Sequence, residues 1–252
     1  MTRSQPRLPP GYRLLSYDSI GSTNEAAKRL ARDGAAEGTL LWAREQTAGR
    51  GRRGRVWISP PGNFYASLIL RPDCSANHAA QLGFVAALAV GEALGAICPG
   101  LGLSYKWPND VLVNGRKIAG ILLESEMICH KRLSFVVLGV GVNLTASPQG
   151  TEFPATSILE EGWGAVPPET MLEGFVQHFQ SWKTRWQLEG FAPVREAWAA
   201  AAAITRGEQI RVRLDTLAFC GSFLDIDHDG SLLLDDAGEC RRIAAGEVFP
   251  AE

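Results

Sequence analysis

Histidine and cysteine are scarce in this chain, and neither forms a pattern that could hold a metal ion or serve as a nucleophile. The five cysteines are odd in number and widely spaced, with no C-x-x-C pair, which excludes a zinc framework and a regular disulfide scaffold. We therefore expect reduced thiols and a cytoplasmic protein. The four histidines stand in unrelated contexts, so we assign none of them a role. No Ser/His/Asp or Cys/His signature of a covalent catalyst is evident either.

The chain also lacks a strong net charge, a long apolar run and any internal repeat. Its formal net charge of −2 gives no long-range attraction to nucleic acid or to an anionic membrane. The apolar stretch at residues 84–96 contains Glu92 and falls short of the roughly 18 residues of a membrane-spanning helix. The N-terminus lacks the apolar core of a secretory signal. What remains is an ordinary globular composition, 46% apolar and 21% charged, in 252 residues that could form one large domain or two unequal ones.

Arginine and glycine, by contrast, are concentrated in residues 49–55, which read Gly-Arg-Gly-Arg-Arg-Gly-Arg and are called the arginine loop below. Glycine lets a backbone approach a ligand closely or adopt a positive φ. Arginine adds a fixed charge and a fork of donors that matches phosphate or carboxylate. Because so many adjacent cations are costly to hold in order without an anion, we interpret the segment as an anion-binding loop. We expect it to be mobile when empty and to order over its ligand.

Two common nucleotide-binding motifs fit this loop by spacing but not by context. Gly49, Gly51 and Gly54 match G-x-G-x-x-G, but the dinucleotide fingerprint needs a helix after its last glycine, and the Pro-Pro-Gly run at 60–62 excludes one. Gly49 and Gly54 also have the spacing of a P-loop, but Arg55-Val56 replaces the Lys-Ser/Thr pair that binds phosphate and magnesium. The anion must therefore be identified from other stretches of the chain.

Hydrophobic periodicity divides the chain into a mixed part and a C-terminal β part. In the first part, strands are expected at residues 12–20, 39–46, 64–71, 103–107, 111–113, 117–123 and 133–144, and helices at 22–34, 75–96, 169–188 and 191–203. Asn114-Gly115 predicts a two-residue hairpin. Short strands at 209–214, 219–226, 231–234 and 241–248 predict a small β-barrel. The predicted fold class is α+β, with domains at 12–204 and 205–252 after a flexible lead-in at 1–11.

Four stretches carry a resemblance to a known family. They are Ser22-Thr23-Asn24, Gln46-x-Ala48-Gly49-Arg50-Gly51-Arg52-Arg53-Gly54-Arg55-x-Trp57, Lys106-Trp107-Pro108-Asn109-Asp110 and Lys117-Ile118-Ala119-Gly120-Ile121-Leu122. In this order and approximate spacing, they closely resemble the biotin protein ligases. The resemblance implies a class II synthetase-like catalytic domain, with a mixed, mainly antiparallel sheet and packed helices, followed by a small SH3-like β-barrel.

The resemblance also implies an activity and its partners. A biotin protein ligase forms biotinyl-5′-AMP from biotin and ATP, then transfers biotin to one lysine of a biotin carboxyl carrier protein domain in a biotin-dependent carboxylase. Attack of a carboxylate on the α-phosphate of ATP brings two anions together, so it needs fixed cations and usually Mg²⁺, and no enzyme nucleophile. Some members carry a helix-turn-helix DNA-binding domain ahead of the catalytic part. Residues 1–11 leave no room for one, so we expect the monofunctional type, which binds no DNA and no membrane. The sequence allows a homodimer without requiring one.

Individual residues take roles from the same resemblance. Biotin is expected to contact Ser22, Thr23, Asn24, Gln46, Arg50, Gly51, Arg52, Lys117 and Gly120. The adenylate is expected to contact Arg52, Arg53, Trp57, Lys117 and Asn143. The catalytic set is Arg52, Lys106, Asp110 and Lys117. Within it Arg52 retains the acyl-phosphate, Asp110 helps to deprotonate the acceptor lysine, and Lys106 faces the phosphates. Magnesium is expected with ATP, near Asp110.

The residues alone leave alternatives open. Ser22 and Glu25 have the spacing of a capping box, so Ser22-Thr23-Asn24 could simply begin a helix. Lys117 could be a surface lysine, and Asn143 an ordinary strand-ending residue. A lipoate or octanoyl-transfer enzyme of related fold could share the lysine-bearing strand, and the arginine loop could clamp nucleic-acid phosphates without catalysis. The complete arginine loop and the Lys-Trp-Pro-Asn-Asp stretch favour biotin, and the low net charge opposes nucleic acid.

Overall fold

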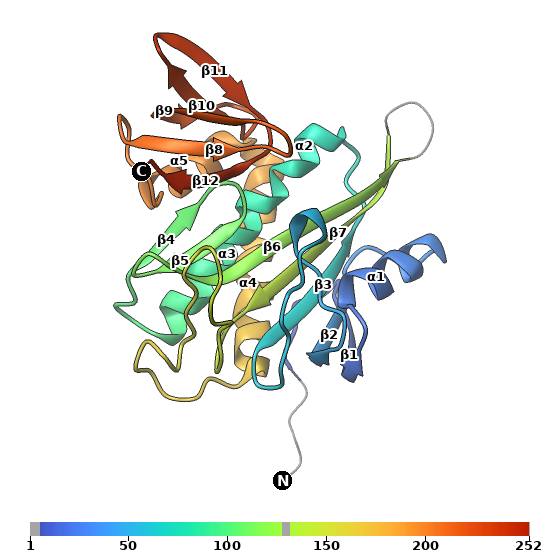
Figure 1. Ribbon diagram of the computed structural model, residues 1–252. Helices are drawn as coiled ribbons and strands as arrows, with labels where there is room; N and C mark the ends of the chain where they lie inside the picture. The colour runs from blue at the N-terminus through green and yellow to red at the C-terminus, as the bar shows by residue number, and fades with distance from the viewer. Residues whose placement is uncertain (1–5, 128–131, 252) are drawn as a thin grey trace.

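A seven-stranded mixed sheet forms the centre of the N-terminal part of the protein (Figure 1). The computed structural model describes residues 6–127 and 132–251. Across the sheet lie β1 (Arg13–Ile20), β2 (Thr39–Gln46), β3 (Phe64–Leu70), β7 (Leu133–Val142), β6 (Arg116–Met127), β5 (Asp110–Val113) and β4 (Leu103–Lys106). The neighbours β1 and β2, which helix α1 (Thr23–Arg32) connects, run parallel, and the other pairs are antiparallel. The predicted mixed, mainly antiparallel sheet is confirmed.

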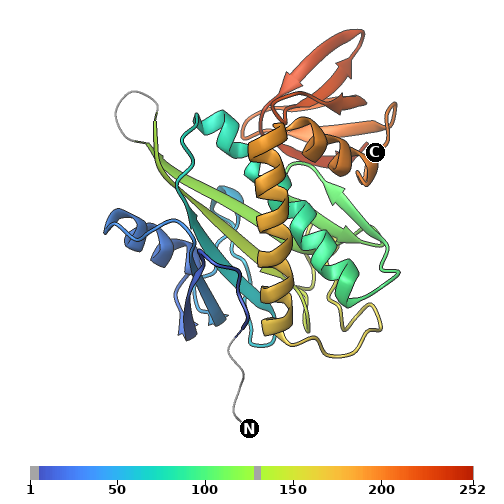
Figure 2. The ribbon, with the colours of Figure 1, turned by 180° about the vertical axis from the view of Figure 1, so that it is seen from behind.

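Helices cover both faces of this sheet. The long helices α3 (Leu82–Ile97) and α4 (Pro168–Glu189) pack side by side against one face, and α5 (Ala192–Ala200) packs against both of them (Figure 2). The apolar residues of α1, among them Ala27 and Ala31, pack against the opposite face. The sheet is therefore the middle layer. Helix α1 covers only part of its side of the sheet, and loops cover the rest.

The helix expected at 75–96 has almost these bounds in the structure but is divided in two. A short helix, α2 (Ala76–Ala80), precedes α3, and together they span the 22 residues Ala76–Ile97. By length and composition alone this segment could cross a membrane, contrary to the expectation from the sequence, but 72% of its most apolar window is buried inside the protein. It forms the central helical layer of the core.

Side chains along β7 alternate between the two faces of the sheet, and this alternation decides where a cavity can lie on the α1 face. Leu138 turns towards the main core with α3 and α4, whereas Val137 turns towards α1. The next positions on the α1 face are Gly139 and Gly141, and Gly141 pairs with Gly120 on β6. Because none of these three residues has a side chain, this area of the sheet is bare backbone. It forms the floor of the cavity described below.

Five antiparallel strands make the C-terminal domain, in the order β11 (Glu239–Ile243), β10 (Leu232–Asp236), β9 (Ala218–Ile226), β8 (Gln209–Arg213) and β12 (Glu247–Pro250). They agree with the predicted small β domain, but the single strand expected at 241–248 is wrong, since β11 and β12 lie on opposite edges of the sheet. Gly246 lets the chain cross between them, because a side chain there would lie 3.0 Å from Val212. The crossing brings β12 to the catalytic part, where Glu247 and Phe249 reach the cavity.

Residues 6–11, predicted as part of a flexible lead-in, lie against α4. The backbone N–H of Arg7 donates to Glu173 at 2.7 Å, and Leu8 packs against the main core. This attachment carries no local sequence signal, because its partner helix lies 166 residues further along the chain.

Candidate functional site

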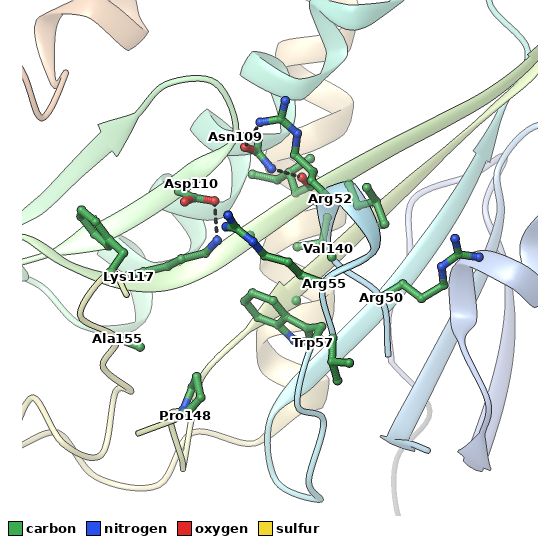
Figure 3. Close-up of a pocket in the computed structure, with 18 of the residues that line it drawn as sticks. Arg50, Arg52, Arg55, Trp57, Asn109, Asp110, Lys117, Val140, Pro148 and Ala155 are labelled. Atoms are coloured by element: carbon green, nitrogen blue, oxygen red, sulfur yellow. Dashed lines mark hydrogen bonds and ion pairs between the residues drawn. The ribbon is translucent and has the colours of Figure 1, made fainter. Parts of the chain in front are cut away.

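A cavity of about 350 Å³ lies on the α1 face of the central sheet (Figure 3). Its walls come from the start of α1, the arginine loop, the turn between β4 and β5, strands β6 and β7, and residues 148–155, with β12 of the C-terminal domain at one side. Every predicted site residue except Arg53 lines it: Ser22, Thr23, Asn24, Gln46, Arg50, Gly51, Arg52, Trp57, Lys106, Asp110, Lys117, Gly120 and Asn143. Segments far apart in the sequence thus meet in one place.

The floor of the cavity is glycine backbone. A Cβ atom on Gly141 would lie 2.6 Å from the indole of Trp57, and one on Gly120 would lie 3.0 Å from the same ring. The indole therefore rests directly on β6 and β7, which a larger residue at either position would prevent. The Nζ of Lys117 lies 5.4 Å from the centre of this ring. Flat apolar groups can pack on this floor, as Trp57 does.

The polar end of the cavity lies at the start of α1. The Oγ of Ser22 accepts from the N–H of Glu25 at 3.5 Å, so the predicted helix cap is confirmed. The Oε1 of Gln46 accepts from the N–H of Thr23 at 2.8 Å and from its hydroxyl at 3.0 Å, and the Nε2 donates to Ser59 at 3.0 Å. These bonds fix which atoms of Thr23 and Gln46 a polar ligand would meet.

Further hydrogen bonds fix the amide of Asn24. Its Nδ2 donates to Glu124 at 2.9 Å, and its Oδ1 accepts from Ser67 at 2.5 Å. Lys28 also binds Glu124, with an N–O distance of 2.8 Å. Burial alone would raise the pKa of Glu124, but hydrogen bonds from Lys28 and Asn24 outweigh it and hold that pKa below its ordinary value. The sequence prediction omitted Ser67 and Glu124, although a serine in the buried strand β3 was an available signal.

Cations gather at the other end of the cavity, around the turn that joins β4 to β5. The Nζ of Lys117 lies 2.6 Å from Asp110 Oδ1, and Arg52 donates to Asn109 at 3.0 Å (Figure 3). Lys106 is only 9% exposed, and its Nζ lies 3.5 Å from the centre of the Phe153 ring. A buried ammonium group in contact with an aromatic face is stabilised by the ring quadrupole.

Burial also changes the titration of two of these cations. It lowers the pKa of Lys106 to about 8, a shift that Asp110 opposes and Lys117 reinforces. Burial likewise lowers the pKa of Arg52 from its ordinary value, although a guanidinium stays protonated at neutral pH. The cavity lining carries five cations (Arg50, Arg52, Arg55, Lys106 and Lys117) and three carboxylates (Asp110, Glu152 and Glu247), so positive charge is in excess, which favours an anionic ligand.

The arginine loop forms a tight hairpin with Arg53 near its tip at a φ of 54°. Arg50 turns back towards α1, where its guanidinium pairs with Glu25. Arg53 points to the C-terminal domain, where it pairs with Asp215 at 2.9 Å and lies 3.8 Å from Glu247, and it does not itself line the cavity. Its predicted contact with an adenylate, like the predicted mobility of the loop, stays a prediction.

Carboxylates outside the predicted site hold the loop. Glu247 of β12 pairs with Arg55 at 2.7 Å and with Arg213 at 2.7 Å, and Glu152 pairs with Arg213 at 2.6 Å. Burial would raise the pKa of Glu247, but hydrogen bonds from Arg213 and Arg55 hold that pKa below its ordinary value. No local signal marks Glu247 as a site residue, because 192 residues separate it from Arg55.

Asn143 lies buried at the end of β7. Its Nδ2 donates to the backbone carbonyl of Thr156 at 3.0 Å. The backbone of Lys117 also binds this segment, through Pro154 at 2.8 Å and Thr156 at 2.9 Å. These bonds fasten residues 148–155 beside Lys117 and bring Phe153 over Lys106, a contact that the sequence did not predict.

The predicted magnesium ion requires oxygen ligands. Within residues 6–127 and 132–251, no group of three or more His, Cys, Asp or Glu side chains could hold a metal ion. Asp110 presents one carboxylate to the cavity, and Mg²⁺ in ATP enzymes is commonly bound by one or two carboxylates together with substrate phosphates. The donor set therefore fits an ion bound jointly with a nucleotide.

Four cysteines are free thiols, namely Cys74, Cys98, Cys220 and Cys240, and Cys129 lies outside the described residues.

Two family models match the sequence. Residues 17–143 match the Biotin/lipoate A/B protein ligase family, and residues 205–249 match the Biotin protein ligase C terminal domain. The first match ends at Asn143, and the second covers nearly all of the five-stranded C-terminal sheet.

Relatives and solved structures agree with these matches. The chain is 45% identical over 234 residues to a biotin–[acetyl-CoA-carboxylase] ligase from Paracoccus denitrificans. The aligned region covers 90% of this chain and 96% of that protein. It is 34% identical to the corresponding ligase from Mycobacterium tuberculosis, over 90% of this chain and 85% of that protein. It is similar in structure to a biotin protein ligase from Aquifex aeolicus in complex with biotin and ATP, with a TM-score of 0.79 at 26% identity over 94% of this chain and 97% of that one. The chain therefore belongs to the biotin/lipoate A/B protein ligase family and, within it, to the biotin protein ligases.

Proposed function

We propose that this protein makes biotinyl-5′-AMP from biotin and ATP and then transfers biotin to a specific lysine of a biotin carboxyl carrier protein. The observation that carries the proposal is one cavity with a polar pocket at one end and an excess of cations at the other. A ligand with a polar head, an apolar middle and a carboxylate tail matches this sequence of environments. The acetyl-CoA-carboxylase ligases among the relatives, and a similar structure in complex with biotin and ATP, support it.

Biotin would lie along the cavity floor. Its ureido head would bind the hydroxyls and amides of Ser22, Thr23, Asn24 and Gln46, which is favourable because these groups are already held by one another. Its ring and apolar chain would pack beside Gly120 and against the indole of Trp57, which itself rests on the glycine floor. Its carboxylate would then reach the Nζ of Lys117, which lies at the cationic end, 5.4 Å from the centre of the Trp57 ring.

The first chemical step joins the biotin carboxylate to the α-phosphorus of ATP, and pyrophosphate leaves. Lys117, Arg52 and Lys106 would neutralise the negative charge that the two anions bring together. When bound with ATP near Asp110, Mg²⁺ would supply further neutralisation of the phosphates. We assign Arg53, Trp57 and Asn143 to the adenylate, with Arg53 acting from the rim, since it lies outside the cavity lining.

The second step is attack of the acceptor lysine amine on the acyl carbon, with AMP as the leaving group. The amine must lose a proton, and Asp110 is the carboxylate beside the reacting end that could accept it. The arginine loop covers the mixed anhydride, which limits its hydrolysis by water. Arg50 and Gly51 would contribute to this cover from the biotin side.

We propose a cytoplasmic setting, since the widely spaced cysteines indicate reduced thiols, and no DNA-binding role, since the formal net charge is −2. The residues that line the proposed site belong to one chain, an arrangement compatible with a homodimer in which each subunit has its own site. The domains at 12–204 and 205–252 are proposed to work together, because the second contributes Glu247 and Phe249 to the cavity wall.

Calorimetric titration with biotin and a pyrophosphate-release assay test the proposal. The wild-type protein should bind biotin and release pyrophosphate with biotin and ATP but not with lipoate and ATP. Lys117→Ala should lower pyrophosphate release by more than about a hundredfold, the scale of losing one group that stabilises transition-state charge, and should retain most biotin binding. The matched control is Arg116→Ala, since Arg116 precedes Lys117 on β6 but pairs with Glu161 at 2.8 Å. Wild-type rates in Lys117→Ala, or a preference for lipoate, would contradict the proposal.

A further inference from the structure

The C-terminal domain touches the turn that carries two of the proposed catalytic residues. Trp107 follows Lys106 in this turn, is only 1% exposed, and donates its indole N–H to the carbonyl oxygen of Gly230 at 2.9 Å. Gly230 lies between β9 and β10, 123 residues further along the chain. A buried indole N–H needs a partner, and here that partner belongs to the other domain.

The acceptor is held firmly. Gly230 donates its N–H to the Asp227 carbonyl at 3.0 Å, and Asp227 donates its own N–H to the Ser231 carbonyl at 2.7 Å. The φ of Gly230 is +93°, and a Cβ atom there would lie 2.9 Å from the ring of Phe84 on α3. Arg242 of β11 pairs with Asp227 at 2.7 Å and ties the turn to its own domain. The turn of the C-terminal domain is therefore seated against α3 in one position.

A second contact holds β4, the strand that leads into the catalytic turn. Tyr105 donates its N–H to the Ala201 carbonyl at 2.8 Å, and its carbonyl accepts from the N–H of Ala203 at 2.7 Å. Residues 201–203 connect α5 to the C-terminal domain. At the other end of the turn, Asn109 is held by β6, through its carbonyl and the Ile121 N–H at 3.0 Å. Between these two anchored ends, Trp107 supplies the hydrogen bond from the turn to the C-terminal domain.

We propose that Trp107 is a positioning residue through which the C-terminal domain sets the places of Lys106 and Asp110 opposite Lys117. The inference rests on the proposed function for the roles of these charged groups. Trp107 also lines the cavity, but its one polar group, the indole N–H, is bound by Gly230 and is not free to bind substrate. The C-terminal domain therefore contributes to adenylate formation through the alignment of the Lys-Trp-Pro-Asn-Asp turn, in addition to the contacts of β12 with the cavity.

Replacement of Trp107 by phenylalanine tests this, because Trp107→Phe keeps an aromatic ring and removes the N–H. The control is Trp186→Phe. Trp186 is also buried, and its indole N–H donates to Gln81 at 2.8 Å, but within the helices behind the sheet. Both variants lose one buried indole hydrogen bond and some thermal stability. Only Trp107→Phe should slow pyrophosphate release at saturating biotin and ATP, by at least about tenfold, as expected when catalytic groups are misplaced by a fraction of an ångström. Its biotin dissociation constant should stay within about twofold of wild type, since the head pocket lies at the other end.

Hydrogen exchange supplies a readout that does not depend on activity. Trp107→Phe, and Gly230→Ala from the other side of the same contact, should speed amide exchange in residues 103–113, whereas Trp186→Phe should not. Unchanged turnover and unchanged exchange in Trp107→Phe would overturn the proposal, as would an equal loss of turnover in Trp186→Phe. Absence of pyrophosphate release in the wild-type protein would instead overturn the proposed function, and the exchange comparison would still decide whether Trp107 couples the two domains.

Discussion

Lys106 is the site residue whose protonation should be visible in kinetics. Burial lowers its pKa to about 8, while Asp110 opposes and Lys117 reinforces the shift. Below that pH the ammonium is charged and can help to bind the triphosphate, and above it the charge is lost. We therefore expect kcat/KM for ATP to fall as the pH rises through about 8, since this ratio reports the free enzyme. In Lys106→Arg the fall should move to higher pH, because a guanidinium keeps its charge.

A pH-stability comparison checks the same group without substrate. Because the pKa of Lys106 is lower in the folded protein than its ordinary value of 10.5, the folded state holds this proton less firmly than the unfolded chain. The charged form therefore costs stability below about pH 8, and that cost disappears as the pH rises towards 10.5. Lys106→Met should raise Tm relative to wild type at neutral pH but not at high alkaline pH. A constant difference across this window would contradict the assignment.

At the residue scale, the sequence motifs predict most of the residues that line the cavity. Gln46, Lys106 and Lys117 were placed in the site because each stands in a distinctive local string, and each lines the cavity. No local motif marks Glu124, because its role comes from a hydrogen bond with Asn24, 100 positions away in the sequence. The resemblance assigns Arg53 to the adenylate, and in the structure its side chain pairs with Asp215 outside the cavity lining.

Strand β7 supports a prediction about the cavity floor. A Cβ atom on Gly139 would lie 2.2 Å from the Oδ1 of Asn24, which Ser67 and Glu124 hold in place. Gly139→Ala should therefore displace Asn24 and weaken biotin binding about tenfold to a hundredfold, the scale of overpacking a filled site. Calorimetric titration with biotin measures the effect.

Gly83→Ala is the control for this substitution. A Cβ atom on Gly83 would lie 3.4 Å from a methyl group of Leu123, and Gly83 lies in α3, behind the sheet. Alanine is favoured over glycine inside a helix, so this variant should be at least as stable as wild type and bind biotin equally well. Tight biotin binding by Gly139→Ala would mean that Asn24 does not contribute to the head pocket.

Elements with a clear local sequence pattern are predicted well, whereas strands whose bounds depend on the strands they pair with are not. The strand expected at 12–20 and the helix expected at 22–34, whose start the capping box marks, agree with β1 and α1 within one or two residues. The expected strand at 241–248 had the right composition, but its division into β11 and β12 depends on pairing with β10 and β8. A strand signal shows that a segment is extended and does not show which neighbour it will pair with.

At the scale of the whole molecule, the site is shared between two domains that the sequence presents one after the other. Phe249 lies 5.1 Å from the Nζ of Lys106, measured to the ring centre, and Gly230 accepts from Trp107. The resemblance to a known family indicated that a β domain follows the catalytic one. It did not indicate which of its residues face the cavity, because these contacts join positions more than a hundred residues apart and leave no local pattern.

The contact between Glu247 and the arginine loop leads to the last prediction. Glu247 pairs with Arg55 and Arg213, and this carboxylate is only 13% exposed. Glu247→Gln removes the charge but keeps the size, so the loop should detach more often, and trypsin should cleave faster after the arginines of residues 50–55. Asp236→Asn is the control, because Asp236 pairs with Arg241 at 2.8 Å in the same domain but away from the loop. Biotin and ATP together should slow cleavage in both proteins, since a ligand that binds the ordered loop lowers the fraction that is open. Equal cleavage rates in Glu247→Gln and wild type would mean that the ion pairs of Glu247 do not hold the loop in place.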